Sequence, residues 1–245
     1  MNTLWSFGDS FSEEVDNLPS TNERITYIKE YLNGVPYKTW PGVVADKLNY
    51  NYRNHAATSG NEFKYLGNGN SNDSMFFNVA EYSSEFKRGD IVIIGFTSTG
   101  RYQVPINNDI NGVWTILPNQ DFGPDTERYL QWCVDRDSSD YYVYEIMQRF
   151  KLLESLAKVV GFTIYYWNWT GQFEKTPDIN LDKWILYQIT KNKLGIGHLL
   201  ETVGVPDNLT IKEETNGKLT DQHWGKITND ILGDIFYNYI KNNKI

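Results

Sequence analysis

The sequence predicts a single α/β domain with a largely parallel β-sheet that is covered by helices on both faces. Apolar runs typical of strands alternate with helical stretches along all 245 residues, and this alternation produces parallel sheets. The clearest strand, residues 90–95, contains four consecutive β-branched residues without polar alternation, as expected for a strand buried on both faces. No repeat and no Pro/Ser-rich linker divides the chain. We therefore expect one domain over residues 1–245.

Local signals predict the individual elements. The first strand is apolar and aromatic, and it stops at the turn sequence Gly8-Asp9-Ser10. Ile25, Ile28 and Leu32 stand at helical spacing and predict the first helix. Trp40-Pro41 predicts the start of the next helix, because proline is favoured in the first helical turn. In chain order, the expected elements are a strand over 3–7, helices over 21–32 and 40–48, strands over 50–57 and 90–95, a helix over 140–160, a strand over 162–169 and a helix over 224–240.

The second half of the chain contains the strongest helix signal and a long insertion. Residues 140–160 carry one apolar stripe, followed by Gly161 where a left-handed residue commonly ends a helix. The last helix is predicted from Ile227, Ile231, Ile235 and Tyr239, which recur every four residues. Two segments show no regular periodicity. The polar, glycine-rich residues 58–74 and the proline-containing residues 100–138 are therefore expected to be loops, the second a long insertion.

Composition excludes several classes of function. The chain has 31 Asp and Glu against 23 Lys and Arg and a net charge of −8, and no basic stripe reverses this sign locally, so nucleic acid is not expected as a partner. Cys133 is the only cysteine, so no intrachain disulfide can form. Neither a signal peptide nor a membrane span is recognisable. We expect a protein that is cytoplasmic as synthesised, with no membrane partner, unless a particle such as a virion carries it elsewhere.

Ser10 is the candidate nucleophile. It follows a predicted buried strand, and open α/β sheets bind their ligands at the carboxyl ends of the strands. A serine hydroxyl becomes nucleophilic only when a base accepts its proton. Of the three histidines, only His223 has a carboxylate within two residues, Asp221, although Asp221 also suits the N-cap of the last helix. His198 follows a Gly-Ile-Gly turn and is interpreted as a loop residue.

Four stretches of the chain, taken in order, resemble conserved blocks of the SGNH/GDSL hydrolase family. They are Trp5–Ser12, Asn54–Asn61, Ile93–Ser98 and Asp221–His223. A further stretch, Thr39–Leu48, is similar to the helix that commonly follows the first block. The resemblance implies a three-layer α/β/α sandwich whose central, mostly parallel sheet has five strands, as in flavodoxin-like folds. It also implies that Ser10 attacks, that His223 accepts the proton and that Asp221 orients the imidazole.

The same resemblance implies an oxyanion hole and no cofactor or metal. The backbone N–H groups of Ser10 and Gly60 would face the developing negative charge, together with the side chain at position 97. Two departures from the family pattern stand out. Thr97 occupies the place of an asparagine that usually donates to the oxyanion. Asp221 lies two residues before His223 instead of three, and Thr220 occupies the usual place of the acid.

The expected function is hydrolysis of small acyl esters, O-acetyl groups on a carbohydrate in particular, through an acyl-enzyme. The resemblance implies a small ester or an acetylated polysaccharide as the partner. Aromatic residues make up 15% of the chain, which suits packing in the core or a surface on which sugar rings stack. Asn61, Arg101 and Trp224 are candidate substrate contacts, although Arg101 also suits a surface salt bridge.

Two alternatives stay open. The first is a binding or structural module that kept the fold and lost catalysis, which the change at Thr97 favours. A resemblance to phage-encoded members of the family would suit a virion component of either kind. The second is an O-acyltransferase, in which a sugar hydroxyl replaces water. The sequence does not define the oligomeric state.

Overall fold

The structure, a computed structural model, describes the strands of the central sheet, the helices that cover it and short pieces of the connecting segments. The described residues are 1–8, 23–33, 37–56, 62–63, 67–68, 72–96, 102–105, 113–116, 127, 131, 141–168, 183–185, 210–219 and 223–243.

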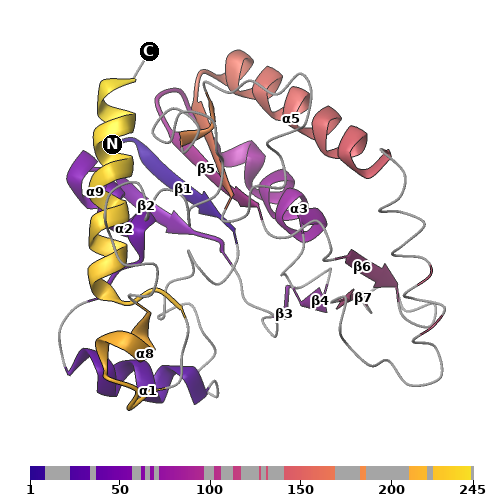
Figure 1. The fold of residues 1–245 in the computed structure, drawn as a ribbon. Coiled ribbons are helices and arrows are strands. Elements are labelled where there is room, and N and C mark those ends of the chain that lie inside the picture. Colours follow the sequence, from indigo (N-terminus) through magenta and orange to yellow (C-terminus); the bar gives the residue numbers. More distant parts are fainter. Residues whose placement is uncertain are drawn as a thin grey trace.

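The central sheet is parallel, and the predicted α/β class is confirmed. Its strands are β1 (Thr3–Phe7), β2 (Asn51–Asn54), β5 (Ile91–Phe96) and β8 (Thr163–Asn168). They lie in the order β2-β1-β5-β8 with parallel pairing throughout (Figure 1). Numbered along the chain as parallel strands, this is the 2-1-3-4 order of flavodoxin-like sheets.

The sheet has four strands within the described ranges, whereas five were expected. One residue marks the place of a further strand. Trp184 forms an isolated parallel bridge with Tyr166 of β8, and Tyr166 pairs with Ile94 of β5 on its other side. The bridge therefore lies on the outer edge of β8, where the fifth strand of this topology belongs.

Helices α3 (Asn72–Tyr82) and α5 (Tyr141–Val160) cover one face of the sheet (Figure 1). Their apolar side chains form one cluster with the alternate residues of the strands that point to this face. The predicted stripe of α5 is confirmed at Ile146, Met147 and Phe150, which are all buried. Gly161 ends the helix with a φ of 92°, as its position predicted.

Helices α2 (Trp40–Leu48) and α9 (Lys226–Asn242) cover the opposite face, which completes the three layers (Figure 1). The last helix is confirmed, and Ile231, Ile235 and Tyr239 of its predicted stripe pack half-buried against the core. Ile227 is 50% exposed, whereas Leu232, Phe236 and Ile240 are fully buried. The buried face is fixed by α2, since Gly233 of α9 lies so close to Val43 that a Cβ at residue 233 would overlap that side chain.

Three features differ from the predicted loops. Helix α3 was not predicted, because its apolar residues follow a glycine-rich stretch that reads as a continuous loop. The predicted loop over 58–74 also holds a two-stranded piece, β3 (Glu62–Phe63) with β4 (Gly67–Asn68). The insertion over 100–138 contains an antiparallel pair, β6 (Tyr102–Pro105) with β7 (Val113–Ile116).

The remaining short helices are α1 (Glu23–Leu32), the 3-10 helix η2 (Ser83–Glu85) and α8 (Ile211–Glu214). Helices α1 and α8 lie side by side below the N-terminal end of α9 (Figure 1). No helix within the described part of the chain is long and apolar enough to cross a membrane.

Candidate active site

The carboxyl ends of the parallel strands meet at one edge of the sheet, and this edge is the candidate active site. The register aligns Ser6 of β1 with Asn54 of β2, and Phe7 with Ile94 of β5. Ser10 is the third residue after the end of β1, and Thr97 is the first residue after the end of β5. The predicted site residues Ser10, Gly60, Asn61, Thr97, Arg101 and Asp221 themselves lie outside the described residues.

His223 is described, and its backbone is tied to α8. Its carbonyl oxygen accepts a hydrogen bond from the N–H of Ile211 at 2.9 Å. The next residue, Trp224, forms an antiparallel bridge with Thr210, directly before α8. The backbone of His223 is therefore held next to α8, and the residue that follows it, Trp224, is held there as well.

Trp224 connects this segment to the sheet. Its ring centroid lies 6.2 Å from that of Trp167, which pairs with Gly95 one residue before the ends of β8 and β5. His223 thus belongs to the same carboxyl edge as the strand end that precedes Thr97. Trp224 is only 9% exposed and belongs to the core cluster on the α2 and α9 side of the sheet. Its predicted contact with substrate stays a prediction.

Two polar side chains hold the backbone that follows His223. The Tyr37 hydroxyl donates to the carbonyl of Trp224 at 3.1 Å. The amide nitrogen of buried Asn229 lies 3.1 Å from the same carbonyl, 3.0 Å from the carbonyl of Gly225 and 2.8 Å from the Tyr37 hydroxyl, so its two N–H groups are shared among three acceptors. Its oxygen accepts from the N–H of Trp40 at 2.9 Å. A buried amide with donors and acceptors satisfied fixes one local geometry.

His55 lies at the end of β2, and its surroundings suit packing instead of proton transfer. Its ring stacks on Tyr82, with centroids 3.8 Å apart, and on Phe7 and Trp5. Burial, and then the charge of Arg53, lower the pKa of His55 to about 4. Its Nε2 atom is buried and has no hydrogen-bond partner within the described part of the chain. His55 is therefore neutral at pH 7 and acts as an aromatic ring in the core.

This environment gives a pH-dependent stability. Between pH 6.5 and 4, the His55 imidazole binds a proton in the unfolded chain but not in the folded protein. The free energy of unfolding therefore falls as the pH falls through this window. The full effect of such a shift, discounted for partial exposure, is about 2 kcal/mol. The His55→Phe variant has no group to titrate here and serves as the reference. Between pH 7 and pH 4, we expect the wild-type protein to lose about 2 kcal/mol more of its free energy of unfolding, measured in urea, than the variant loses. A difference between the two proteins that does not change with pH would contradict the assignment.

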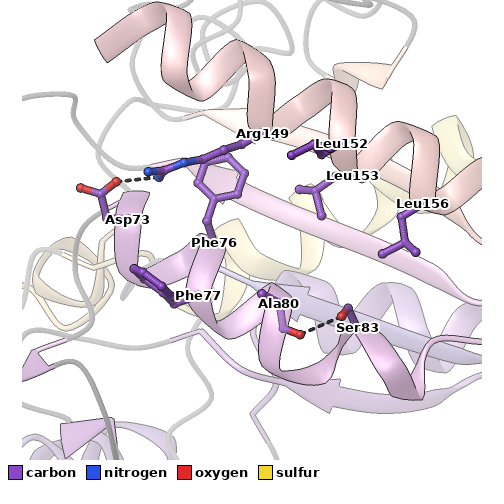
Figure 2. Close-up of a pocket in the computed structure, with 9 residues that line it drawn as sticks. All are labelled: Asp73, Phe76, Phe77, Ala80, Ser83, Arg149, Leu152, Leu153 and Leu156. Atoms are coloured by element: carbon purple, nitrogen blue, oxygen red, sulfur yellow. Dashed lines mark hydrogen bonds and ion pairs between the residues drawn. The ribbon is translucent and has the colours of Figure 1, made fainter. Parts of the chain in front are cut away.

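A separate apolar groove of about 320 Å³ lies between α3 and α5. Figure 2 shows phenylalanine and leucine side chains along it, with the ion pair of Arg149 and Asp73 at one end. The two charged groups are 2.6 Å apart, and the guanidinium lies 5.2 Å from the centroid of the Phe76 ring. None of the lining residues comes from a strand end, so the groove is not part of the candidate active site.

Sequence reasoning proposed Ser10 and His223, which stay predictions, and it did not single out the residues around His223. Tyr37 and Asn229 were not singled out, because their roles depend on contacts between segments 192 residues apart. One signal was available, since Asn229 adjoins Thr228 on the face of α9 that carries Leu232 and Phe236, and a polar side chain on a buried face needs partners. No cluster of three or more His, Cys, Asp or Glu side chains able to hold a metal occurs in the described ranges.

Comparisons with known proteins give a likeness of fold only. No family model matches the chain, and no curated protein matches it. Among solved structures, the chain is similar to the protein YxiM of Bacillus subtilis, with a TM-score of 0.43 and 16% sequence identity. The alignment covers 100% of this chain and 57% of YxiM. The chain thus spans little more than half the length of that protein, and a likeness at this level says nothing about activity.

Proposed function

We propose that the protein is a serine esterase of the SGNH type that removes small acyl groups, O-acetyl groups on carbohydrates in particular. The observation that carries the proposal is the strand order β2-β1-β5 with parallel pairing. It brings the ends of three strands to one edge, immediately before the segments that hold Gly60, Ser10 and Thr97. His223 is anchored at the same edge through the contact of Trp224 with Trp167.

The reaction needs only side chains and backbone groups of the chain. The Ser10 hydroxyl attacks the ester carbonyl, and His223 accepts its proton and returns it to the departing sugar hydroxyl. The new bond joins the Ser10 oxygen to the acyl carbon. His223 then takes a proton from water, whose oxygen bonds to the acyl carbon, and returns that proton to the Ser10 oxygen as the acyl bond breaks and the acid leaves. Asp221 stabilises the imidazolium in both steps.

Acetate release tests this function. We expect the protein to hydrolyse p-nitrophenyl acetate and to release acetate from an acetylated polysaccharide such as acetylated xylan. Added sugar acceptor should leave the yield of free acetate unchanged, whereas an acyltransferase would form acetylated acceptor in its place. No turnover of any ester, by a folded protein, would favour a binding module of the same fold.

Thr97 gives a sharper test of the oxyanion hole. We expect Thr97→Val, which replaces the hydroxyl by a methyl group of similar size, to lower kcat by about 100-fold, because the loss of one oxyanion donor typically has this effect. KM should change little, since the donor acts mainly on the transition state. Steady-state kinetics with p-nitrophenyl acetate measure both constants. An unchanged kcat would show that Thr97 does not face the oxyanion.

A further inference from the structure

Helix α9 begins three residues after His223, and side chains from two other helices hold its N-terminal end. The hydroxyl of Tyr31, in α1, accepts a hydrogen bond from the N–H of Lys226 at 2.8 Å and donates to the carboxylate of Glu214, in α8. The other carboxylate oxygen of Glu214 accepts from the N–H of Ile227 at 3.1 Å. Three segments that are remote in sequence therefore meet at one helix end.

This pair replaces the ordinary cap of the helix. The first N–H groups of a helix have no partner inside it, and the N-cap residue here is Gly225, which has no side chain to offer. Tyr31 and Glu214 satisfy two of these groups, and the carboxylate also suits the positive end of the helix dipole. A Cβ at position 225 would overlap the Glu214 carboxylate, so a larger residue there would displace this flexible side chain from the helix end. Burial, and then the bond to Glu214, raise the pKa of Tyr31, so its hydroxyl remains a donor.

The same short helix holds both sides of His223. The N–H of Ile211, at the start of α8, donates to the carbonyl of His223 at 2.9 Å, and Glu214, at the end of α8, holds the helix that begins after it. Tyr31 fixes the Glu214 carboxylate and the Lys226 N–H at once. A shift of Tyr31 or Glu214 would therefore move the backbone between His223 and the start of α9 relative to α8.

We propose that Tyr31 and Glu214 are positioning residues that set the place of His223 at the sheet edge. Their role in the reaction rests on the proposed function, in which His223 is the base. A misplacement of about 1 Å can lower a catalytic rate by roughly 100-fold. The loss of one hydroxyl should let the His223 segment move by part of that distance.

The test compares two tyrosines that contact opposite ends of α9. Tyr31→Phe keeps the ring and removes the hydroxyl at the N-terminal end. Tyr165→Phe is the matched control, because the Tyr165 hydroxyl, at 3.5 Å, donates to the carbonyl of Asn243 beyond the C-terminal end. We expect Tyr31→Phe to lower kcat by about 10-fold with KM within twofold, and Tyr165→Phe to leave both within twofold. Glu214→Gln, which keeps an oxygen for the Ile227 N–H, should retain more activity than Glu214→Leu.

A second readout does not depend on activity. Amide hydrogen exchange at Lys226 and Ile227, followed by NMR, should accelerate at least 10-fold in Tyr31→Phe and not in Tyr165→Phe. The imidazole signals of His223 should shift, while those of His55 stay in place. If the wild-type protein lacks esterase activity, the proposed function fails, and the NMR result still decides whether Tyr31 positions His223. Unchanged exchange and unchanged His223 signals in Tyr31→Phe would overturn the inference, whatever the change in stability.

Discussion

Replacement of Ser10 by alanine should lower kcat for ester hydrolysis by at least about 1,000-fold while the melting temperature stays within about 2 °C of the original. The loss is large because the variant has no atom that can form the acyl-enzyme, and the residual rate comes from binding and oxyanion contacts alone. Stability should not change, since Ser10 lies beyond the end of β1 and outside its ladder with β2 and β5. Steady-state kinetics and thermal unfolding monitored by circular dichroism measure the two effects.

Ser6 supplies the control for this variant. It lies in β1, four residues before Ser10 in the sequence. Its side chain is fully buried, and its hydroxyl has no hydrogen-bond partner within the described ranges. Removing an unsatisfied buried hydroxyl is close to neutral. Ser6→Ala should therefore keep kcat within twofold. Activity that survives in Ser10→Ala but is lost in Ser6→Ala would place the nucleophile elsewhere.

Replacement of Gly95 by alanine should lower the free energy of unfolding by about 3 kcal/mol, because overpacking a close-packed core typically costs 1–3 kcal/mol and occasionally more. A Cβ at position 95 would overlap the indole of Trp167. That indole has no room to retreat. It is fully buried, and the ring centroid of Trp40 lies 5.4 Å away on α2. Urea unfolding measures the loss.

The same substitution should impair the site as well as the core. Trp167 is the contact on which Trp224 rests, so its displacement moves the residue next to His223. We expect kcat to fall by roughly 10-fold at a temperature where Gly95→Ala remains folded. The double variant Gly95→Ala with Trp167→Phe should lose less free energy of unfolding than the two single variants lose together, because the smaller ring makes room for the methyl group. Strictly additive effects would show that the two residues do not meet.

Much of the fold could be predicted from local patterns. Strand β5 and helix α5 were placed within one residue of their ends, because an unbroken β-branched run and a long apolar stripe each allow one structure. The buried face of α9 could not be predicted in this way. The series Ile227, Ile231, Ile235 and the series Leu232, Phe236, Ile240 have the same spacing, and the close approach of α2 at Gly233 selects the second.

The candidate site also contains residues that sequence motifs indicate and residues that only the tertiary structure reveals. The candidate nucleophile and the candidate base were singled out because short motifs place one after a strand and the other before a terminal helix. Tyr31 and Glu214 carry no motif, and the contact between them joins positions 183 residues apart. A side chain of this kind acquires its role only from the tertiary structure. Its type, a tyrosine on an amphipathic helix or a glutamate on a short one, fits many surfaces equally well.

The most direct test of the central claim is covalent labelling by a fluorophosphonate, followed by peptide mass spectrometry. Such a probe reacts with a serine only when a base deprotonates it and an oxyanion hole receives the phosphoryl oxygen. We predict one adduct per chain, on the peptide that contains Ser10, and a labelling rate that falls at least about 100-fold in His223→Ala. A folded protein that remains unlabelled, or an adduct on another residue, would contradict a serine at the end of β1 activated by His223.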